Sequence, residues 1–327
     1  EVPPQAKGFR INTPTGQIVD LGTEFGLEIA EGDAEVHVFK GEVELHSPSA
    51  AMQSLTEGQA ASFASTPELR KADPAGFASL NDLDARSELS ERSKFARWLD
   101  QSREWNQDPA LRLRFDFQDS SESRSLTNRS TSGSAYPDGS IVGASWTEGR
   151  WPGKGALEFR QVSDRVRLSV PSEVSHLTLT TWVRVNGLDR TFNSLFMSEG
   201  WGERRVHWQI TRDGKIRLGV AGPGDKRHSD YDTPVIFTPE RFGRWIHLAV
   251  VFDPDTAETR HYVDGDRVAT LPLKDASPLR IGIAELGNWN DRRGSDSVAI
   301  RHLSGALDEF CLWERALTDA EIAKLSR

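Results

Sequence analysis

The feature that most limits what this chain can fold into is a series of short, strand-like segments running from Leu111 to Trp313. The segments are rich in β-branched and aromatic residues, as strands are. They read LRLRFDF, ALEF, DRVRLSV, LTLTTWVRV, RVHWQIT, KIRLGV, RWIHLAVVF, TRHYVDG, LRIGIA and GALDEFCLW. Asp213-Gly214 and Asp264-Gly265 separate neighbouring segments, and Asp-Gly is a strong hairpin signal. Because almost no helical pattern lies between them, the segments predict a two-sheet β-sandwich.

Residues 1–66 predict a second, smaller antiparallel β unit. Between Val19 and Ile29 the side chains alternate in character, which is typical of a single strand with one buried face. The polar, glycine-containing stretch at 31–34 predicts a hairpin turn. The alternation changes phase at Lys40-Gly41, where we expect a β-bulge to keep the apolar side chains on a common face. Another short strand is expected within residues 55–63.

The segment between the two β regions has a helical pattern. From Asp82 to Trp105 the large apolar side chains recur at helical spacing, and the first turns are acidic, as a helix N-terminus favours. Asp108-Pro109 ends the pattern, because the residue before a proline is disfavoured in the α region. We therefore expect residues 67–109 to form a helical linker that leads into a mainly β domain at 110–327.

Charge and cysteine content exclude several functions. The formal net charge is −9 at pH 7 and the isoelectric point is about 5.5. Nucleic acid is therefore not an expected partner, since phosphate contacts need clustered Lys and Arg. Cys311 is the single cysteine, which excludes a disulfide framework and a multi-thiolate zinc site. No apolar stretch approaches a membrane span, and the first residue is Glu1, so we expect any membrane segment to lie upstream of this chain.

Motifs of catalysis do not stand out in the sequence. Neither the Gly-x-Ser-x-Gly turn of hydrolases nor the His-Glu-x-x-His helix of metalloproteases occurs. The acidic run at 31–35 suits a turn better than a catalytic strand. Asp308 and Glu309 are neighbours in a strand segment, so we expect their side chains to point to opposite faces and not to form an acid/base pair. We expect His247 to be structural, and residues 228–232 to form a solvated loop.

Eight of the ten tryptophans divide into two groups by their surroundings. Four lie in strand segments and are predicted to be core residues: Trp182, Trp208, Trp245 and Trp313. Four others lie among glycines, polar and charged residues: Trp146, Trp151, Trp201 and Trp289. An exposed indole in such a loop can stack on a sugar ring, so these four are the candidate ligand-binding residues. The alternative is that each indole anchors its own turn.

The front end resembles a known family. The likeness is carried by GFRINTPTGQIVDLGTEFGLEI, VHVFKGEVELH and LTEGQAASF, and above all by Thr13–Gly16, Asp20–Gly26 and Gly41–Val43. These residues are similar to the C-terminal half of the FecR-type domain, whose first half would lie before Glu1. The resemblance implies a domain outside the cytoplasmic membrane that regulates an extracytoplasmic-function sigma factor, as an anti-sigma-type protein, through a membrane helix absent from this chain.

Residues 110–327 resemble a laminin-G-like, concanavalin A-type jelly roll. The matching segments are LTLTTWVRV, RWIHLAVVFD, HYVDGDRV and LSGALDEFCLWERALTDAEI. The resemblance implies a fold that lectins, glycosidases and adhesion modules share, so it predicts fold more than function. In many relatives an Asp of the final strand binds Ca²⁺ together with backbone carbonyls. Asp308 is therefore the candidate ligand of one structural calcium, and the alternative is an ordinary hydrogen-bonded strand carboxylate.

We thus expect a mainly β, non-catalytic protein: a FecR-like half domain, a linker helix, and a concanavalin A-like jelly roll that binds a polysaccharide or a surface protein. Its expected location is the periplasm or the cell surface, anchored in the membrane. Two alternatives stay open. One is a glycosidase-like enzyme, which needs two carboxylates facing each other in a cleft. The other is a cell-surface adhesion protein.

Overall fold

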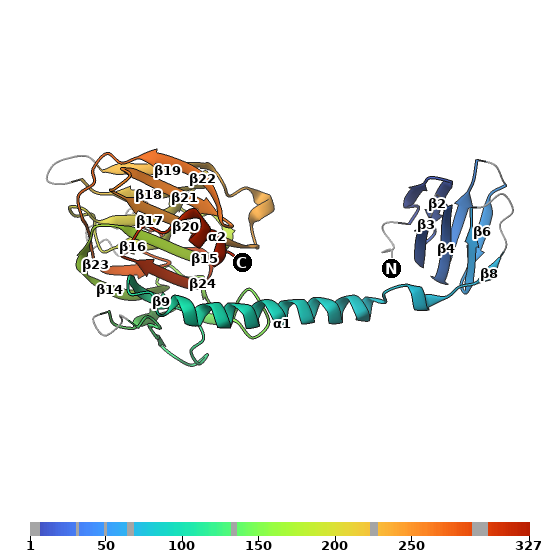
Figure 1. Cartoon of the computed structure of the whole chain (residues 1–327), viewed down its shortest axis with the longest axis horizontal. Helices are drawn as coiled ribbons and strands as arrows, with labels where there is room; N and C mark the ends of the chain where they lie inside the picture. Colours follow the sequence, from blue (N-terminus) through green and yellow to red (C-terminus); the bar gives the residue numbers. More distant parts are fainter. Residues whose placement is uncertain are drawn as a thin grey trace. The chain divides into compact units, whose positions relative to one another are not determined.

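Strands dominate the computed structural model (Figure 1), as the sequence predicts. The structure describes residues 7–30, 33–48, 51–63, 69–131, 136–222, 228–289 and 300–327. The chain forms two compact units, Glu1–Leu89 and Ser90–Arg327, so the division falls inside the long helix α1 (Leu80–Trp105). Within the described residues, no helix combines the length and the apolar character needed to cross a membrane.

The first unit consists of two four-stranded antiparallel sheets, ordered β1-β2-β5-β6 and β3-β4-β7-β8. Its strands are β1 (Arg10–Thr13), β2 (Gly16–Asp20), β3 (Glu24–Ala30), β4 (Asp33–Lys40), β5 (Glu42–His46), β6 (Gln53–Thr56), β7 (Gln59–Ser62) and β8 (Arg70–Lys71). The core between the sheets is built from Ile18, Val36, Val38, Val43 and Leu55, all with no exposed surface. β3 and β4 pair as the predicted hairpin, and residues 31–32 of the predicted turn lie outside the described part.

The predicted single strand from Val19 to Ile29 is wrong. β2 ends at Asp20 and β3 begins at Glu24, and the two strands belong to different sheets. The phase change at Gly41 has the same cause, because β4 and β5 also lie in different sheets; a register shift does occur just before it, between Val38 and Lys40. Alternation continues across each crossing because both sheets turn their apolar side chains toward one core.

The turn between β2 and β3 gives the Asp-Leu-Gly-Thr motif a structural role. The buried Asp20 carboxylate accepts hydrogen bonds from the backbone N–H of Gly22 at 3.0 Å and of Thr23 at 2.8 Å. Gly22 has a φ of +104°, a backbone conformation that residues other than glycine rarely adopt. The motif therefore allows the chain to leave one sheet and enter the other.

Replacing Asp20 with alanine is expected to lower the free energy of unfolding of the first unit by about 1–3 kcal/mol, because the backbone N–H groups of Gly22 and of the buried Thr23 lose their acceptor. Thermal unfolding followed by circular dichroism measures the change. Asp20→Asn keeps one acceptor oxygen and should cost less. Equal losses for both variants would contradict the assignment.

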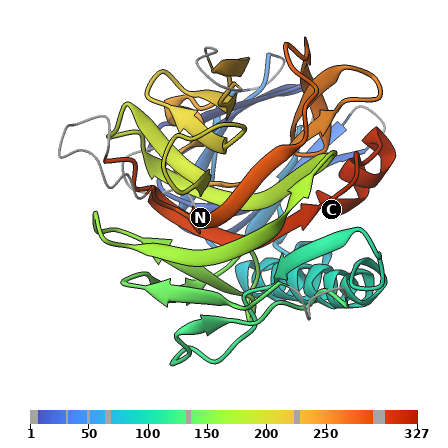
Figure 2. The same cartoon turned by 90° about the vertical axis from the view of Figure 1, so that its left-hand side faces the viewer.

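The second unit is a sandwich of two eight-stranded antiparallel sheets. The β17 sheet has the order β10-β11-β14-β23-β16-β17-β18-β19, and the β24 sheet has the order β12-β13-β24-β15-β20-β21-β22, with β9 also paired to β24. The strands are β9 (Leu111–Phe115), β10 (Ser125–Leu126), β11 (Gly139–Val142), β12 (Ser145–Glu148), β13 (Gly155–Phe159), β14 (Arg165–Val174), β15 (Leu177–Gly187), β16 (Phe192–Ser198), β17 (Val206–Thr211), β18 (Lys215–Val220), β19 (Ser229–Val235), β20 (Trp245–Asp253), β21 (Glu258–Val263), β22 (Asp266–Pro272), β23 (Leu279–Leu286) and β24 (Ser304–Trp313). In Figure 2 the long, curved β15 and β24 run side by side through this unit.

Both predicted Asp-Gly hairpins are confirmed. Gly214 (φ +84°) lies between β17 and β18. Asp264 (φ +52°) and Gly265 (φ +90°) join β21 to β22, as a two-residue hairpin with positive φ at both positions requires. Each of these turns fixes the register of the two strands that it joins.

The outer face of the β24 sheet is covered by helices. Trp105 of α1 packs against Trp313 of β24 at 6.4 Å between ring centroids. Ile322 of α2 (Asp319–Leu325) and Cys311 of β24 belong to the same buried cluster. Of the four tryptophans predicted to be core, Trp208 lies between the two sheets, Trp313 lies under the helices, and Trp182 and Trp245 are only half-buried.

Candidate functional site

The outer face of the β17 sheet is rich in polar side chains. Along β17 and β18 the residues facing the interior are apolar, and the alternate residues His207, Gln209 and Arg217 face outward. Residues 228–232, predicted to be a solvated loop, instead enter β19, whose Tyr231 is buried in the core. The alternation of side chains along a strand explains why the loop prediction is wrong, because Asp230 and Asp232 occupy only the outward positions of β19.

Trp201 lies against this face, and its indole is the candidate platform for a ligand. Its loop joins β16 to β17, and its half-buried ring lies 4.1 Å from the His207 ring and 5.5 Å from the His228 ring between centroids. A Cβ on Gly219 of β18 would lie 3.4 Å from the Trp201 ring, an ordinary van der Waals distance, so the indole packs directly against this strand. Of the four candidate tryptophans, Trp201 therefore joins indole surface to a polar sheet face.

His207 supports the platform as a neutral group. Its side chain is buried, and burial together with the positive charge of Arg301 lowers the pKa of this imidazole to about 3. Its Nε2 lies 3.0 Å from the Gly200 carbonyl oxygen. The imidazole is therefore uncharged at neutral pH and presents its ring to Trp201 without the repulsion or hydration of a cation.

Trp289 is a buried support, not an exposed indole. It is 7% exposed, its Nε1 donates to the Ser198 carbonyl at 3.1 Å, and its ring lies 5.1 Å from that of His207. The Arg301 guanidinium lies over the ring, 4.0 Å from its centroid. Of the two interpretations left open for this residue, its burial favours the anchor over a ligand-binding ring; residues 290–299, which follow it, lie outside the described part.

An ion-paired group lies beside Trp201 on the same face. Arg217 of β18 contacts Asp230 and Asp232 of β19, each at 2.7 Å. The hydrogen bond to Asp232 is the main cause of a raised pKa of Arg217, with both carboxylate charges adding to it against the effect of burial. A guanidinium held between two carboxylates offers donors and acceptors in fixed places next to an aromatic ring. A sugar ring with its hydroxyl groups matches this combination.

Trp146 is a residue of β12 and lines a separate, polar hollow of about 210 Å³. The ring is half-buried, and its Nε1 donates to the Ser123 carbonyl at 2.9 Å. Serines, Glu122 and Arg124 line the rest of the hollow. The indole N–H of Trp146 thus ties β12 to the segment around Ser123, and the ring still contributes surface to a small concavity.

Trp151 and Asp308 lie together on the outer face of the β24 sheet, in a buried cluster that contains several charged side chains. Trp151 is 7% exposed, and the Arg150 guanidinium lies 4.4 Å from its ring centroid. Asp308 has no exposed surface; its Oδ2 accepts from the Arg150 backbone N–H and Nε, both at 3.0 Å, and its Oδ1 lies 2.5 Å from Lys154 Nζ. Of the two interpretations left open for Trp151, its burial favours the anchor over a ligand-binding indole.

The expectation that Asp308 and Glu309 point to opposite faces is also wrong. The register of β15 with β24 shifts between Thr181 and Trp182, and Glu309 has φ +70°, so an extra residue is accommodated at this point of β24. Such a bulge brings two consecutive side chains to one side of a sheet. Arg150 accordingly contacts Asp308 at 3.0 Å and Glu309 at 3.1 Å.

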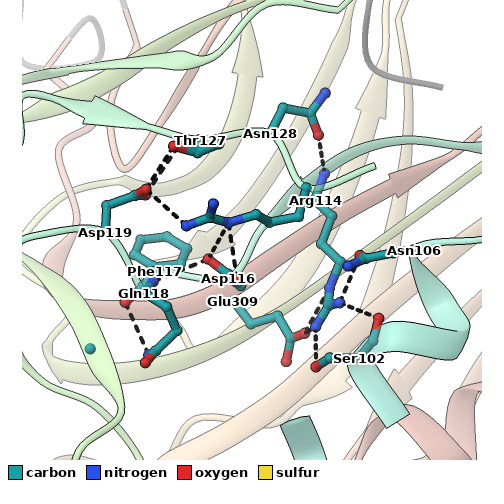
Figure 3. A network of polar contacts seen from close by, with 12 residues as sticks. Ser102, Asn106, Arg114, Asp116, Phe117, Gln118, Asp119, Thr127, Asn128 and Glu309 are labelled. Carbon is teal, nitrogen blue, oxygen red and sulfur yellow. Dashed lines mark hydrogen bonds and ion pairs between the residues drawn. The ribbon is translucent and has the colours of Figure 1, made fainter. Parts of the chain in front are cut away.

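Glu309 ties helix α1 to the sandwich (Figure 3). Its Oε2 accepts from Trp98 Nε1 at 2.7 Å, and its Oε1 contacts Arg114 Nη2 at 2.6 Å. Arg114 also donates to the Ser102 carbonyl and to Asn106 Oδ1, both at 2.8 Å. Burial alone would raise the pKa of Glu309, but the charges of Arg114, Arg150 and Lys154 outweigh it and hold the value at about 2.

The surroundings of Asp308 do not fit a calcium ion. Calcium needs six to eight oxygen ligands. The two oxygens of Asp308 instead contact an ammonium and a guanidinium group, which would repel a divalent cation. The sequence alone did not show this, because both cations come from a loop about 150 residues earlier in the chain.

One other group in the described residues places metal-ligand atoms together: His176, Asp253 and Asp255, within 4.8 Å of one another. Asp253 already accepts from Arg260 Nη2 at 3.0 Å, and His176 Nε2 lies 3.1 Å from Asp255. These contacts explain why the three side chains lie close together: they pair with one another and with Arg260 beside the turn between β20 and β21.

Two family models match the sequence in the predicted order. The model described as FecR protein matches residues 1–44, and the one described as the concanavalin A-like lectin/glucanases superfamily matches residues 160–323. No curated protein matches the chain.

Solved structures similar to this chain include three proteins with carbohydrate or binding functions in their descriptions. Domain 4 of AbnA, a GH43 extracellular arabinanase from Geobacillus stearothermophilus in complex with arabinotriose, is 18% identical over 66% of this chain and 98% of its own, with a TM-score of 0.49. The binding domain of paraclostridial mosquitocidal protein 1 is 14% identical over 66% and 52%, with a TM-score of 0.51. The Ruminococcus gnavus IT-sialidase CBM40 bound to α2,3-sialyllactose is 15% identical over 47% and 83%, with a TM-score of 0.39. The mosquitocidal binding domain is the one of these three with a TM-score above 0.5, and at 14% identity its likeness shows the fold alone.

Proposed function

The chain belongs to the concanavalin A-like lectin/glucanases superfamily, and we propose that it is a non-catalytic, FecR-type regulatory protein whose jelly roll binds a carbohydrate. The proposed site is the outer face of the β17 sheet around Trp201. The observation that carries it is the indole platform on His207 and Gly219, with the ion-paired Arg217 beside it. The other sheet is not proposed as the site, since α1 and α2 cover its outer face.

The two parts of the proposed site have complementary tasks. The half-buried Trp201 ring supplies an apolar surface on which a pyranose ring can stack. Arg217, Asp230 and Asp232 supply the hydrogen bonds that orient the hydroxyl groups. Because the two carboxylates and the guanidinium are already paired, binding requires no rearrangement of charge, and a neutral, hydroxyl-rich ligand suits the site.

Replacing Trp201 with alanine is expected to weaken carbohydrate binding about tenfold, the effect of losing roughly 1.4 kcal/mol of stacking. A polysaccharide array identifies the ligand, and isothermal titration calorimetry measures the change. Trp245→Ala is the matched control: it removes another half-buried indole, packed under Arg184 at 5.2 Å, but on the other sheet. Equal affinity of both variants and the wild type would contradict the proposed site.

The regulatory part of the proposal rests on the FecR match. We place the protein outside the cytoplasmic membrane, in the periplasm or at the cell surface, with an extracytoplasmic-function sigma factor as its partner system. Ligand binding at Trp201 is the proposed input signal. A transcriptional reporter of that sigma factor should respond to the polysaccharide in cells with the wild-type protein and lose the response in cells with Trp201→Ala. A polysaccharide response that is the same in both strains would refute the coupling.

A glycosidase is the second candidate function, and one observation favours it. Asp230 and Asp232 occupy outward positions of the same strand, where two carboxylates can face one substrate. Release of reducing sugar from a bound polysaccharide, lost in Asp230→Asn, would establish the enzyme and overturn the non-catalytic proposal. If the array shows no carbohydrate binding at all, the adhesion alternative, with protein ligands, gains support.

A further inference from the structure

A buried amine and a buried carboxyl group are in close contact in the second unit. Lys154 directly precedes β13, and Asp308 lies on β24, the strand that pairs with β13. Both side chains have no exposed surface, and Lys154 Nζ lies 2.5 Å from Asp308 Oδ1. Oδ1 accepts no hydrogen bond of regular geometry, so this contact is close without being a well-directed ion pair.

Burial makes the charged form of this amine less stable. Lys154 Nζ lies 4.6 Å from the Trp98 ring centroid and 6.0 Å from that of Phe117. Burial lowers the pKa of Lys154, opposed by the charge of Asp308, while the nearby Arg150 lowers it further. An ammonium lacks the lone pair of a nucleophile, so attack begins with the loss of one proton from Nζ, which a lowered pKa makes easier.

Asp308 is held so that its two oxygens differ. Oδ2 accepts from the Arg150 backbone N–H and from Arg150 Nε, both at 3.0 Å. Two fixed donors, one of them charged, stabilise the negative charge that develops on a carboxyl oxygen when a nucleophile adds to its carbon. Oδ1 faces the amine and is the oxygen in position to leave.

We propose that Lys154 and Asp308 condense to an amide cross-link in the folded chain, without another enzyme. Nζ attacks Cγ of Asp308, the Nζ–Cγ bond forms, and the Cγ–Oδ1 bond breaks. Counted from the ammonium and the carboxylate, two protons pass from Nζ to Oδ1, which leaves as one water, and one proton stays on the amide nitrogen. The step changes no oxidation state, so it needs no oxidant, reductant or cofactor.

The product fits the contacts already in place. Nζ lies 2.5 Å from the Asp116 carbonyl oxygen and 3.1 Å from that of Gly155, so the amide N–H has an acceptor. The amide oxygen keeps both Arg150 donors. Condensation also replaces a buried ion pair, whose desolvation is costly, by a neutral group. Two reactants held in contact react at an effective concentration far above any in solution, which favours the amide in a site that excludes water.

The intact mass of the purified, denatured wild-type chain tests the proposal. The expected mass is lower than that of the sequence by one water, about 18 Da. Tandem mass spectrometry of a tryptic digest should then find a branched peptide joining Lys154 to Asp308. Asp308→Asn should lose ammonia, about 17 Da, because an amide nitrogen would then leave in place of Oδ1.

Two lysine variants complete the experiment. Lys154→Met should have the full mass of its sequence. Lys324→Met is the matched control: Lys324 also contacts a carboxylate, Glu104 at 2.8 Å, but both are at the surface, so this variant should still lose one water through Lys154. A folded wild-type chain that keeps its full mass after days at pH 7–8 would overturn the proposal, and this result does not depend on whether any variant folds.

Discussion

Lowering the pH from 7 to 5 is expected to remove about 6 kcal/mol from the free energy of unfolding of the second unit. Three buried histidines cause this loss. The pKa is lowered to about 3 in His207 and His247 and to about 4 in His261, in each case mainly by burial. Arg301 lowers it further in His207, and Arg150 in His247.

The direction of this pH effect depends on whether the folded or the unfolded state binds more protons. In the unfolded chain each imidazole titrates near pH 6.5, whereas in the folded chain it stays neutral well below that value. The stabilisation is therefore complete above about pH 6.5 and is lost as the pH falls toward 3–4, at about 2 kcal/mol for each histidine by pH 5. A loss of this size is a large part of the stability of an ordinary domain.

Urea unfolding at pH 7 and pH 5, followed by tryptophan fluorescence, measures the loss. His261→Leu should reduce it by about 2 kcal/mol, because one of the three histidines is gone. His228→Gln removes a histidine that is 52% exposed, and it should leave the loss as large as in the wild type. Equal free energies of unfolding at both pH values would mean that water reaches the three imidazoles in the folded state.

Replacing Arg114 with methionine is expected to cost about 3–5 kcal/mol of the free energy of unfolding. The guanidinium is 1% exposed and is the shared donor for Glu309, the Ser102 carbonyl and Asn106. Methionine fills much of the same volume but removes one donor from each of these acceptors, and Glu309 loses one of its two guanidinium partners in a buried site, which is costly. Hydrogen exchange of residues 95–105 should speed up, because Glu309 and Arg114 connect this end of α1 to the sandwich.

Arg103→Met is the matched control on the same helix. Arg103 is 81% exposed and contacts Asp100 at 3.3 Å, and exposed pairs of this kind contribute about 0–1 kcal/mol. The free energies of unfolding of the two variants, measured by thermal and urea unfolding, should therefore differ widely. Similar losses for Arg103→Met and Arg114→Met would contradict the role of the buried network in holding α1.

Two sequence patterns, side-chain alternation and helical spacing, predicted the secondary structure, and both depend only on residues close together in the chain. Alternation marked the strands of both units, and helical spacing marked α1, which begins two residues before the predicted start at Asp82. The dipeptides Asp213-Gly214 and Asp264-Gly265 turned where predicted, since few other residues adopt positive φ at low cost. The order of the two matched families was also contained in the sequence.

Other features depended on contacts between distant residues. Trp289 and Trp201 lie in equally polar, glycine-containing stretches, yet one is buried under Arg301 and the other is half-buried on Gly219. Nothing within a few residues of either indole distinguishes them. Which one can meet a ligand depends on which loop packs against it.

By itself the sequence determined the strand and helix segments, the hairpin turns and the β-rich class, because side-chain periodicity and backbone preferences act over a few residues. Only the tertiary structure decided that the strand after Asp20 enters another sheet, that a bulge brings Asp308 and Glu309 to one side, and that Lys154 meets Asp308. Each of these depends on the pairing of segments far apart in the chain, and no local pattern encodes which segments pair.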